Sequence, residues 1–421
     1  MTLPDLAWIG LTRKNSPLLL VSSLRIKGSC LQTRRLSRTN PIRLDHEARR
    51  RITTTPPPPP PYDILFCGTD EFARESLKAI AERKELFESI HVLTPPDSKT
   101  GWGSKRMKVS AVKRFAIENG LDQEDLPRDA GFLGWQLPDK IRRSNRRLLI
   151  AASFGHMIPD SVIESFGHAS QALNLHPSLL PQLRGAAPIQ WAIARDLKTT
   201  GVSVQELGKG EFDRGRILSQ KTIEIPPLST FSSLEPRLAK LGSSLLVQVI
   251  SQLPKYSESS WSQHEAEATN AFKVKRDDVE VKWAKWTAQE IHARYRGFGY
   301  LYKLSTNLVP LPRRGKAETF PTVRVLLTSL KEPGHLEALA ELDRRSHDIL
   351  SSETTKEGMA TFSDSLGALV VKCKGDTFLR VDKLQVEKKG EKEAREWWRG
   401  FRDRGDDRGR ILFEFLKQTV L

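Results

Sequence analysis

The sequence predicts an α/β protein in which a Rossmann-like, mostly parallel sheet is followed by a smaller, basic, β-barrel-like (OB-like) domain. Over residues 62–255, short apolar runs alternate with segments of helical periodicity, the pattern of parallel strands joined by crossover helices. From Phe272 onward, short β-rich runs alternate with helices in a changed pattern. At 421 residues the chain is also longer than one ordinary core, so two domains with tails are expected.

The first domain opens with a strand, a tight turn and a helix. Residues 62–67 form an apolar run that ends at Gly68, and Asp70 stands at the N-cap of a helix with apolar residues at helical spacing. We expect further strands at 90–93, 148–152, 172–175, 202–207 and 217–225, and further helices at 109–119, 189–197 and 234–253. Ligands of such sheets bind at the carboxyl ends of the strands.

A polar stretch at 255–271 is interpreted as a linker, so that the first domain covers 62–254 and the second covers 272–421. In the second domain we expect strands at 322–327 and 368–372 and helices at 287–296 and 393–402. Residues 343–356 form a polar insertion without strong periodicity. The mixture of short strands and helices favours a small barrel-like domain.

The N-terminal segment 1–61 begins with the composition of an organelle transit peptide. Its first 51 residues carry eleven Lys or Arg against three acids, and the segment lacks the compact apolar core of a secretory signal. Six prolines at 56–61 then form a stiff spacer; a ligand for a proline-reading domain is the other interpretation. The folded protein is expected to begin near Tyr62.

The net charge of +16 is unevenly distributed along the chain. Residues 1–61 contribute +8, residues 62–267 contribute +1 and residues 268–421 contribute +7. Clustered Lys and Arg gain affinity for polyanions by releasing counterions from phosphates. The second domain is therefore expected to bind a polyanion, with simple solubility as the alternative.

Several classes of protein are disfavoured. No apolar run approaches the roughly 20 residues of a membrane span, so no membrane partner is expected. Three cysteines, Cys30, Cys67 and Cys373, are far apart and fit no metal-ligand spacing, and we expect neither a metal nor a disulfide. The turn after Gly68 lacks the glycines of a dinucleotide fingerprint. Nothing in the sequence suggests more than a monomer.

Asn174 and His176 form a polar pair within an apolar, proline-rich run at 173–190. They lie two apart at a strand end and so share a face, and Pro177 keeps His176 extended. An amide can donate to a developing oxyanion, and an imidazole can relay a proton near neutral pH. The loop between the next two strands offers Asp213 to orient the ring. On local evidence alone, a structural role for an Asn-x-His pair is the commoner one.

A resemblance over longer segments favours a catalytic role instead. The segment Asn174-Leu-His-Pro-Ser-Leu-Leu-Pro-Gln-Leu-Arg-Gly-Ala-Ala-Pro-Ile189 resembles the signature of folate-dependent formyltransferases, and its Arg184-Gly-Ala-Ala-Pro part resembles those that act on methionyl-tRNA. Residues 62–73, 96–113, 152–159 and 200–217 resemble other segments of the same family, in order. The resemblance covers about 62–255 and continues more weakly into the second domain.

The resemblance implies transfer of a formyl group from 10-formyltetrahydrofolate to the α-amino group of methionine on an initiator tRNA. Together with the transit-like segment, it leads us to expect a protein of the mitochondrial matrix. Asn174 would donate to the oxyanion, His176 would stabilise that charge or handle the amine proton, and Asp213 would orient the imidazole. Folate-site residues would be Ser178, Leu179, Leu180 and Pro181. Expected tRNA contacts are Trp102, Lys105, Arg106 and Arg184, together with the basic second domain.

One residue departs from the family pattern. Trp102 stands between two glycines where the family often carries Arg. Lys105 or Arg106 could replace that contact, or Trp102 could stack on a base; packing of the ring under the loop is an equal alternative. Rival functions are a formyltransferase for a small amine, a formyltetrahydrofolate hydrolase, or a non-catalytic organellar RNA-binding protein.

Overall fold

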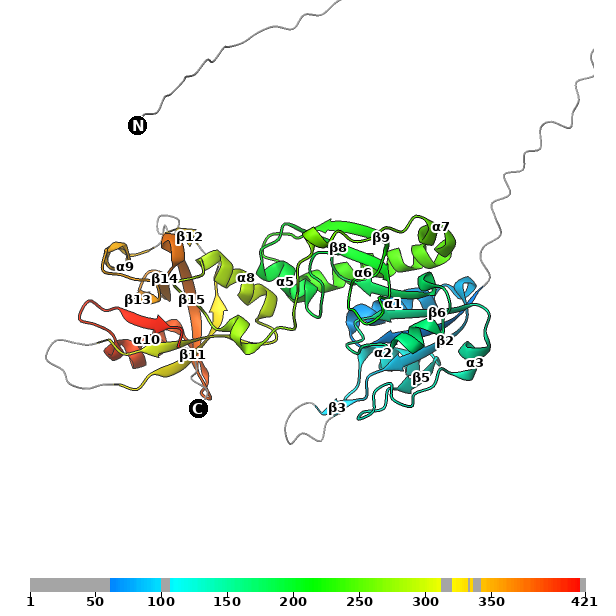
Figure 1. Ribbon diagram of the computed structural model, residues 1–421. Coiled ribbons are helices and arrows are strands. Elements are labelled where there is room, and N and C mark those ends of the chain that lie inside the picture. The colour runs from blue at the N-terminus through cyan, green and yellow to red at the C-terminus, as the bar shows by residue number, and fades with distance from the viewer. Residues whose placement is uncertain (1–60, 100–106, 312–319, 332–333, 336–341, 417–421) are drawn as a thin grey trace, which may run out of the picture. The chain divides into compact units, whose positions relative to one another are not determined.

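The computed structural model describes residues 61–99, 107–311, 320–331, 334–335 and 342–416 (Figure 1). The predicted transit segment, apart from Pro61, lies outside these ranges, as do Trp102, Lys105 and Arg106. In the sequence these three residues stand between two short paired strands, β3 (Ser98–Lys99) and β4 (Met107–Lys108).

A seven-stranded sheet in the order β5-β2-β1-β6-β7-β8-β9 forms the first domain. Its first five strands run parallel, and β8 and β9 are antiparallel to their neighbours. The predicted, mostly parallel sheet is confirmed. The strands are β1 (Tyr62–Gly68), β2 (Phe87–Thr94), β5 (Asp122–Asp125), β6 (Arg147–Ala152), β7 (Ala172–His176), β8 (Thr199–Glu206) and β9 (Ile217–Glu224).

Helices cover both faces of this sheet (Figure 1). Alternate residues of β1 serve different cores: Ile64 and Phe66 belong to one, Leu65 and Cys67 to the other. This alternation follows from the two-residue period of a strand. The helices are α1 (Glu71–Ala81), α2 (Ala111–Glu118), α3 (Asp139–Arg143), α4 (Asp160–Glu164), α5 (Pro188–Ala194), α6 (Phe231–Ser251) and α7 (Leu253–Glu258).

Local sequence explains where α1 begins. Asp70 is the N-cap, and its side chain accepts a hydrogen bond from the backbone N–H of Ala73, which satisfies one of the donors left free at a helix start. The buried face of the helix includes Phe72, Leu77 and Ile80. The N-cap predicted at Asp70 is therefore confirmed.

The second domain is built on a closed barrel. Six strands follow one another in the order β11-β10-β17-β13-β14-β15, and β15 pairs with β11 to close the ring. They are β10 (Leu304–Val309), β11 (Val323–Leu330), β13 (Met359–Ser363), β14 (Ala368–Cys373), β15 (Thr377–Val386) and β17 (Ile411–Glu414). Short strands β12 (Gly334–His335) and β16 (Glu391–Glu393) add to β15. The predicted barrel-like domain is confirmed.

Three helices accompany the barrel: α8 (Ala288–Phe298), α9 (Arg344–Ser351) and α10 (Ala394–Phe401). The helix α9 lies inside the segment that was expected to be a polar insertion without strong periodicity. Asp343 caps it by accepting from the N–H of Ser346, and Leu350 is fully buried against Val370 and Phe378. The cap and the apolar anchor both help to hold this short helix on the barrel.

Buried thiols occur in both domains. Cys67 and Cys373 are fully buried and unpaired, and burial raises the pKa of each thiol, which makes them poor nucleophiles. Among the described residues no helix is long and apolar enough to cross a membrane. In the same ranges no cluster of three His, Cys, Asp or Glu side chains could hold a metal ion.

Candidate active site

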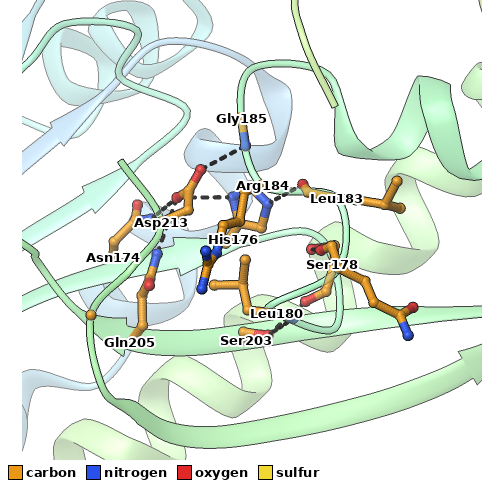
Figure 2. A network of polar contacts seen from close by, with 12 residues as sticks. Asn174, His176, Ser178, Leu180, Leu183, Arg184, Gly185, Ser203, Gln205 and Asp213 are labelled. Atoms are coloured by element: carbon orange, nitrogen blue, oxygen red, sulfur yellow. Dashed lines mark hydrogen bonds and ion pairs between the residues drawn. The ribbon is translucent and has the colours of Figure 1, made fainter. Parts of the chain in front are cut away.

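The polar pair of the sequence lies on β7, near the point where parallel pairing gives way to antiparallel pairing. Asn174 and His176 stand on one face of this strand, and Asp213 reaches them from the loop between β8 and β9 (Figure 2). The predicted meeting of the three side chains is thus present in the structure. Both residues stand toward the carboxyl end of β7, and ligands of such sheets bind beyond the carboxyl ends of the parallel strands.

Asp213 is the centre of the polar network. Its Oδ1 accepts from Asn174 Nδ2 at 3.1 Å and from Gln205 Nε2 at 3.0 Å, and its Oδ2 accepts from the backbone N–H of Gly185 at 2.8 Å. The residue has a φ of 57°, a conformation that non-glycine residues adopt at a cost and that often marks functional sites. Both oxygens of the side chain are thus held by hydrogen-bond donors.

His176 is 5% exposed and has an acceptor beside each ring nitrogen. Nε2 donates to the carbonyl oxygen of Leu183 at 3.0 Å, and Nδ1 lies 3.3 Å from Asp213 Oδ1. A carbonyl oxygen only accepts hydrogen bonds, so the Nε2 nitrogen carries an N–H, and the Asp213 carboxylate orients the ring from its other side.

A cavity of about 540 Å³ opens onto this network, which is a typical size for a small-molecule site. Its walls combine the polar groups of Asn174, His176 and Asp213 with apolar side chains, among which Phe212 is 57% exposed and Phe272 is 67% exposed. The exposed rings offer apolar surface to a planar ligand.

One part of the cavity wall is acidic. Burial raises the pKa of Asp70, opposed by hydrogen bonds from the backbone N–H of Ala73 and from Ser153. Burial also raises the pKa of Glu235, and the charges of Asp70 and Glu71 act in the same direction. Two carboxyl groups in this region disfavour a phosphate group there.

Arg184 lines the cavity but is only 5% exposed. Its guanidinium makes a bidentate ion pair with Glu265, at 2.8 and 2.9 Å, and donates twice to Gln263 Oε1. The side chain expected to contact tRNA is thus committed to the segment that follows α7. Its guanidinium holds this segment in place, and its contact with tRNA stays a prediction.

The four residues expected at the folate site do not line this cavity, although the structure describes all of them. They form a buried turn with a cis Leu180–Pro181 bond. Ser178 Oγ donates to the carbonyl of Gln182, and Leu180 N–H donates to Ser203 Oγ (Figure 2). These polar atoms of the turn are engaged within the protein, and a contact of the turn with folate stays a prediction.

Several cavity residues were not predicted. Ser153, Phe154 and His156 come from the loop after β6, and Gln205 comes from β8, where it pairs with Asn174 across the two strands. The signal for the first group was available, because ligands of such sheets bind beyond strand ends. Gln205 lies in a buried strand and gives no signal in the sequence alone.

Two family models match the chain. The model described as "Formyl transferase" matches residues 63–250, and the one described as "Formyl transferase, C-terminal domain" matches residues 273–402. The chain belongs to the formyl transferase family. The resemblance seen in the sequence is confirmed, and both domains of this formyl transferase are accounted for.

Curated relatives of this formyl transferase include mitochondrial and bacterial proteins. The mitochondrial methionyl-tRNA formyltransferase of Homo sapiens is 32% identical over 248 residues, which is 58% of each chain. That of Mus musculus is 29% identical over 330 residues, 77% of this chain and 75% of that one. The methionyl-tRNA formyltransferase of Thermodesulfovibrio yellowstonii is 34% identical over 236 residues, 56% of this chain and 72% of that one.

The match to the human protein therefore spans less than two thirds of that protein's length. Among solved structures, an N-formyltransferase from Helicobacter canadensis in complex with folinic acid and dTDP-3-aminofucose is 15% identical, with a TM-score of 0.48. The alignment covers 76% of this formyl transferase and 98% of that chain.

Proposed function

We propose that this formyl transferase moves a formyl group from 10-formyltetrahydrofolate to the α-amino group of methionine on initiator tRNA. The observation that carries the proposal is the Asn174–His176–Asp213 network at the mouth of a cavity of about 540 Å³. Family membership supports formyl transfer, and the names of the relatives support methionyl-tRNA as acceptor. The +7 charge of residues 268–421 favours a polyanionic substrate.

The reaction needs no covalent enzyme intermediate. The lone pair of the methionine amine attacks the formyl carbon, a C–N bond forms, and the carbonyl oxygen becomes an oxyanion. The bond from carbon to N10 of the folate then breaks, N10 takes a proton, and the amine nitrogen loses one. The products are formyl-methionyl-tRNA and tetrahydrofolate.

In this scheme Asn174 donates to the oxyanion. An amide nitrogen carries two N–H groups, and Asp213 Oδ1 accepts one of them, which fixes the direction of the other. A preorganised donor of this kind typically contributes 10²–10³-fold in kcat. Asp213 thus orients the amide as well as the imidazole.

His176 stabilises the developing negative charge. Acceptors lie beside both of its ring nitrogens, so both nitrogens are engaged within the protein and neither is directed at the amine as a proton acceptor. The sequence left both roles open. The contacts of the ring favour the electrostatic one, with proton removal from the amine passing to solvent.

The direct test is a formylation assay with the full chain. Initiator Met-tRNA and 10-formyltetrahydrofolate are supplied, and formyl-methionyl-tRNA and tetrahydrofolate are quantified; we expect them in equal amounts. Protein that binds the tRNA and leaves it unformylated would contradict the proposal. Tetrahydrofolate and formate without formylated tRNA would identify a hydrolase.

We also propose that the protein works in the mitochondrial matrix. The cationic, acid-poor segment 1–51 and the mitochondrial relatives support this location. A fluorescent protein fused after residue 60 is expected to accumulate in the matrix. The same fusion with the eleven Lys and Arg of the segment changed to Gln is the control, and it should remain cytosolic. Cytosolic fluorescence of the unaltered fusion would refute the proposal.

A further inference from the structure

The segment between the two domains runs along the active site. Trp261 exchanges backbone hydrogen bonds with Ile217 at 2.8 and 3.0 Å. Further on, Arg184 N–H donates to the carbonyl of Thr269, and Ala271 N–H donates to the carbonyl of Arg184. The linker, 255–271, therefore pairs with both sides of the site.

Gln263 is the linker residue that reaches the catalytic loop. Its Nε2 donates to the carbonyl oxygens of Asp213, at 2.9 Å, and Gly215, at 2.8 Å. Its Oε1 accepts from the guanidinium of Arg184, at 2.6 Å from Nη2 and 3.1 Å from Nε. One side-chain amide thus joins the loop of Asp213 to Arg184 in the turn after β7.

A second linker residue, Thr269, holds Leu183, the other residue that contacts the His176 ring. Thr269 Oγ1 accepts from the backbone N–H of Leu183 at 2.9 Å, and the carbonyl of Leu183 accepts from His176 Nε2. The two groups beside the ring nitrogens, Asp213 and Leu183, are therefore each tied to the linker. Loosening either tie would let an acceptor move away from the ring.

We propose that Gln263 is a positioning residue, through which the linker fixes Asp213 against Asn174 and His176. The inference deepens the proposed formyl transfer and rests on it. Asp213 has a φ of 57°, and its loop must be held in that conformation. The N–H groups of the Gln263 amide hold it through the carbonyl oxygens of Asp213 and Gly215. A displacement of about 1 Å at a catalytic group can cost on the order of 100-fold in rate.

Gln263→Glu distinguishes the contacts of the amide nitrogen from those of the amide oxygen. A carboxylate still accepts from Arg184, but it has no N–H for the carbonyls of Asp213 and Gly215. Gln263→Met removes the contacts of both the nitrogen and the oxygen without adding a charge. We expect each variant to lower kcat for Met-tRNA formylation by at least about tenfold, with KM for tRNA and folate changed less than about twofold.

Arg216→Ala is the matched control. The Arg216 side chain also ties the catalytic domain to the linker, through Ser260 and Ser262, but it makes no hydrogen bond or ion pair with the Asp213 side chain. We expect wild-type kcat in this variant. An equal loss there would show that any weakening of the linker slows the enzyme, and would overturn the specific role of Gln263.

Two other results would also overturn the proposal. Wild-type kcat in Gln263→Glu would show that only the Arg184 contact matters. A loss of kcat in Gln263→Glu that is absent in Gln263→Met would assign the effect to the added charge.

A second readout does not depend on formyl transfer. The ring-nitrogen chemical shifts of His176 should change in both Gln263 variants and stay unchanged in Arg216→Ala; unchanged shifts in all three would refute the geometry even if the wild type formylates. Changed shifts together with an inactive wild type would keep the positioning role and refute only the proposed reaction.

Discussion

At the scale of single residues, the site is organised by one carboxylate. Asp213 accepts from two side-chain amides and one backbone N–H and lies 3.3 Å from His176 Nδ1. Its φ of 57° shows that the loop is held in a conformation that Asp adopts only at a cost. The site therefore depends on the neighbours of Asp213 as much as on the carboxylate itself.

Asp213→Asn should lower kcat by about 10²–10⁴-fold, because an amide group would turn an N–H toward one of the existing donors.

Asn174→Ala should lower kcat by about 10²–10³-fold through loss of the oxyanion donor. KM for Met-tRNA should change little in both, since neither side chain is expected to hold the tRNA. Steady-state formylation kinetics check this. Wild-type turnover in Asp213→Asn would remove that residue from the mechanism.

The sequence predicted the three central residues but not their supports. Asn174 and His176 stood out by their spacing at a strand end, and Asp213 by its place between two strands of the same sheet, but it was the resemblance over longer segments that favoured a catalytic role. Gln205 and Gln263 contact Asp213 from positions that carry no motif. Their roles arise from pairing across the fold, which the order of residues along the chain does not reveal.

At the scale of elements, the turn after β7 is held between the linker and the catalytic loop. Gly185 has a φ of +115°, and a Cβ atom added to it would lie 2.9 Å from the carbonyl oxygen of Ala271. Its N–H also donates to Asp213 Oδ2. The turn requires glycine here, both for its conformation and for the close approach of the linker.

Gly185→Ala is expected to lower the free energy of unfolding by about 1–3 kcal/mol, because the new Cβ meets backbone in a strained conformation. It should also lower kcat, since the N–H that binds Asp213 would shift. Chemical denaturation and formylation kinetics measure the two effects. Gly390→Ala is the control, because nothing lies within 4 Å of the added Cβ, and its stability should match the wild type. Equal stability of the two variants would contradict the tight turn.

Alternating strands and helices with strong periodicity were predictable from local pattern, as the sheet of the first domain shows. The helix α9 was not, because one cap at Asp343 and one buried Leu350 do not make a visible period over eight residues. The hydrogen-bonded turn at 178–181 was likewise not visible, because such a turn and a ligand wall have the same apolar composition in sequence.

At the scale of the whole molecule, α8 of the barrel domain packs on α5 of the sheet domain. Arg296 donates to Asp196 and to the carbonyl of Ser229, both in the first domain. His292, on the same helix, is 5% exposed, and burial lowers its pKa to about 4, with Arg296 acting in the same direction and Asp196 opposing it. The domain junction therefore contains a histidine that is neutral in the folded protein at neutral pH.

This histidine should make the protein sensitive to mild acid. The unfolded chain takes up a proton near pH 6.5 while the folded protein does not until about pH 4, so the stability falls as the pH drops through this window. The slope is at most about 1.4 kcal/mol per pH unit for one group. His292→Leu should flatten the decline of unfolding free energy between pH 6.5 and 4, measured by denaturant titration. The exposed His347→Gln is the control and should leave the slope unchanged; an unaltered slope in His292→Leu would contradict the assignment.

The choice of acceptor is the central claim, and a competition assay tests it most directly. Purified full chain is given 10-formyltetrahydrofolate with Met-tRNA, glycinamide ribonucleotide and an amino sugar nucleotide together, and the formylated products are separated and counted. The site and the basic second domain predict formyl-methionyl-tRNA as the dominant product, with kcat/KM for the small amines lower by orders of magnitude. A small amine formylated as efficiently as Met-tRNA would contradict the account.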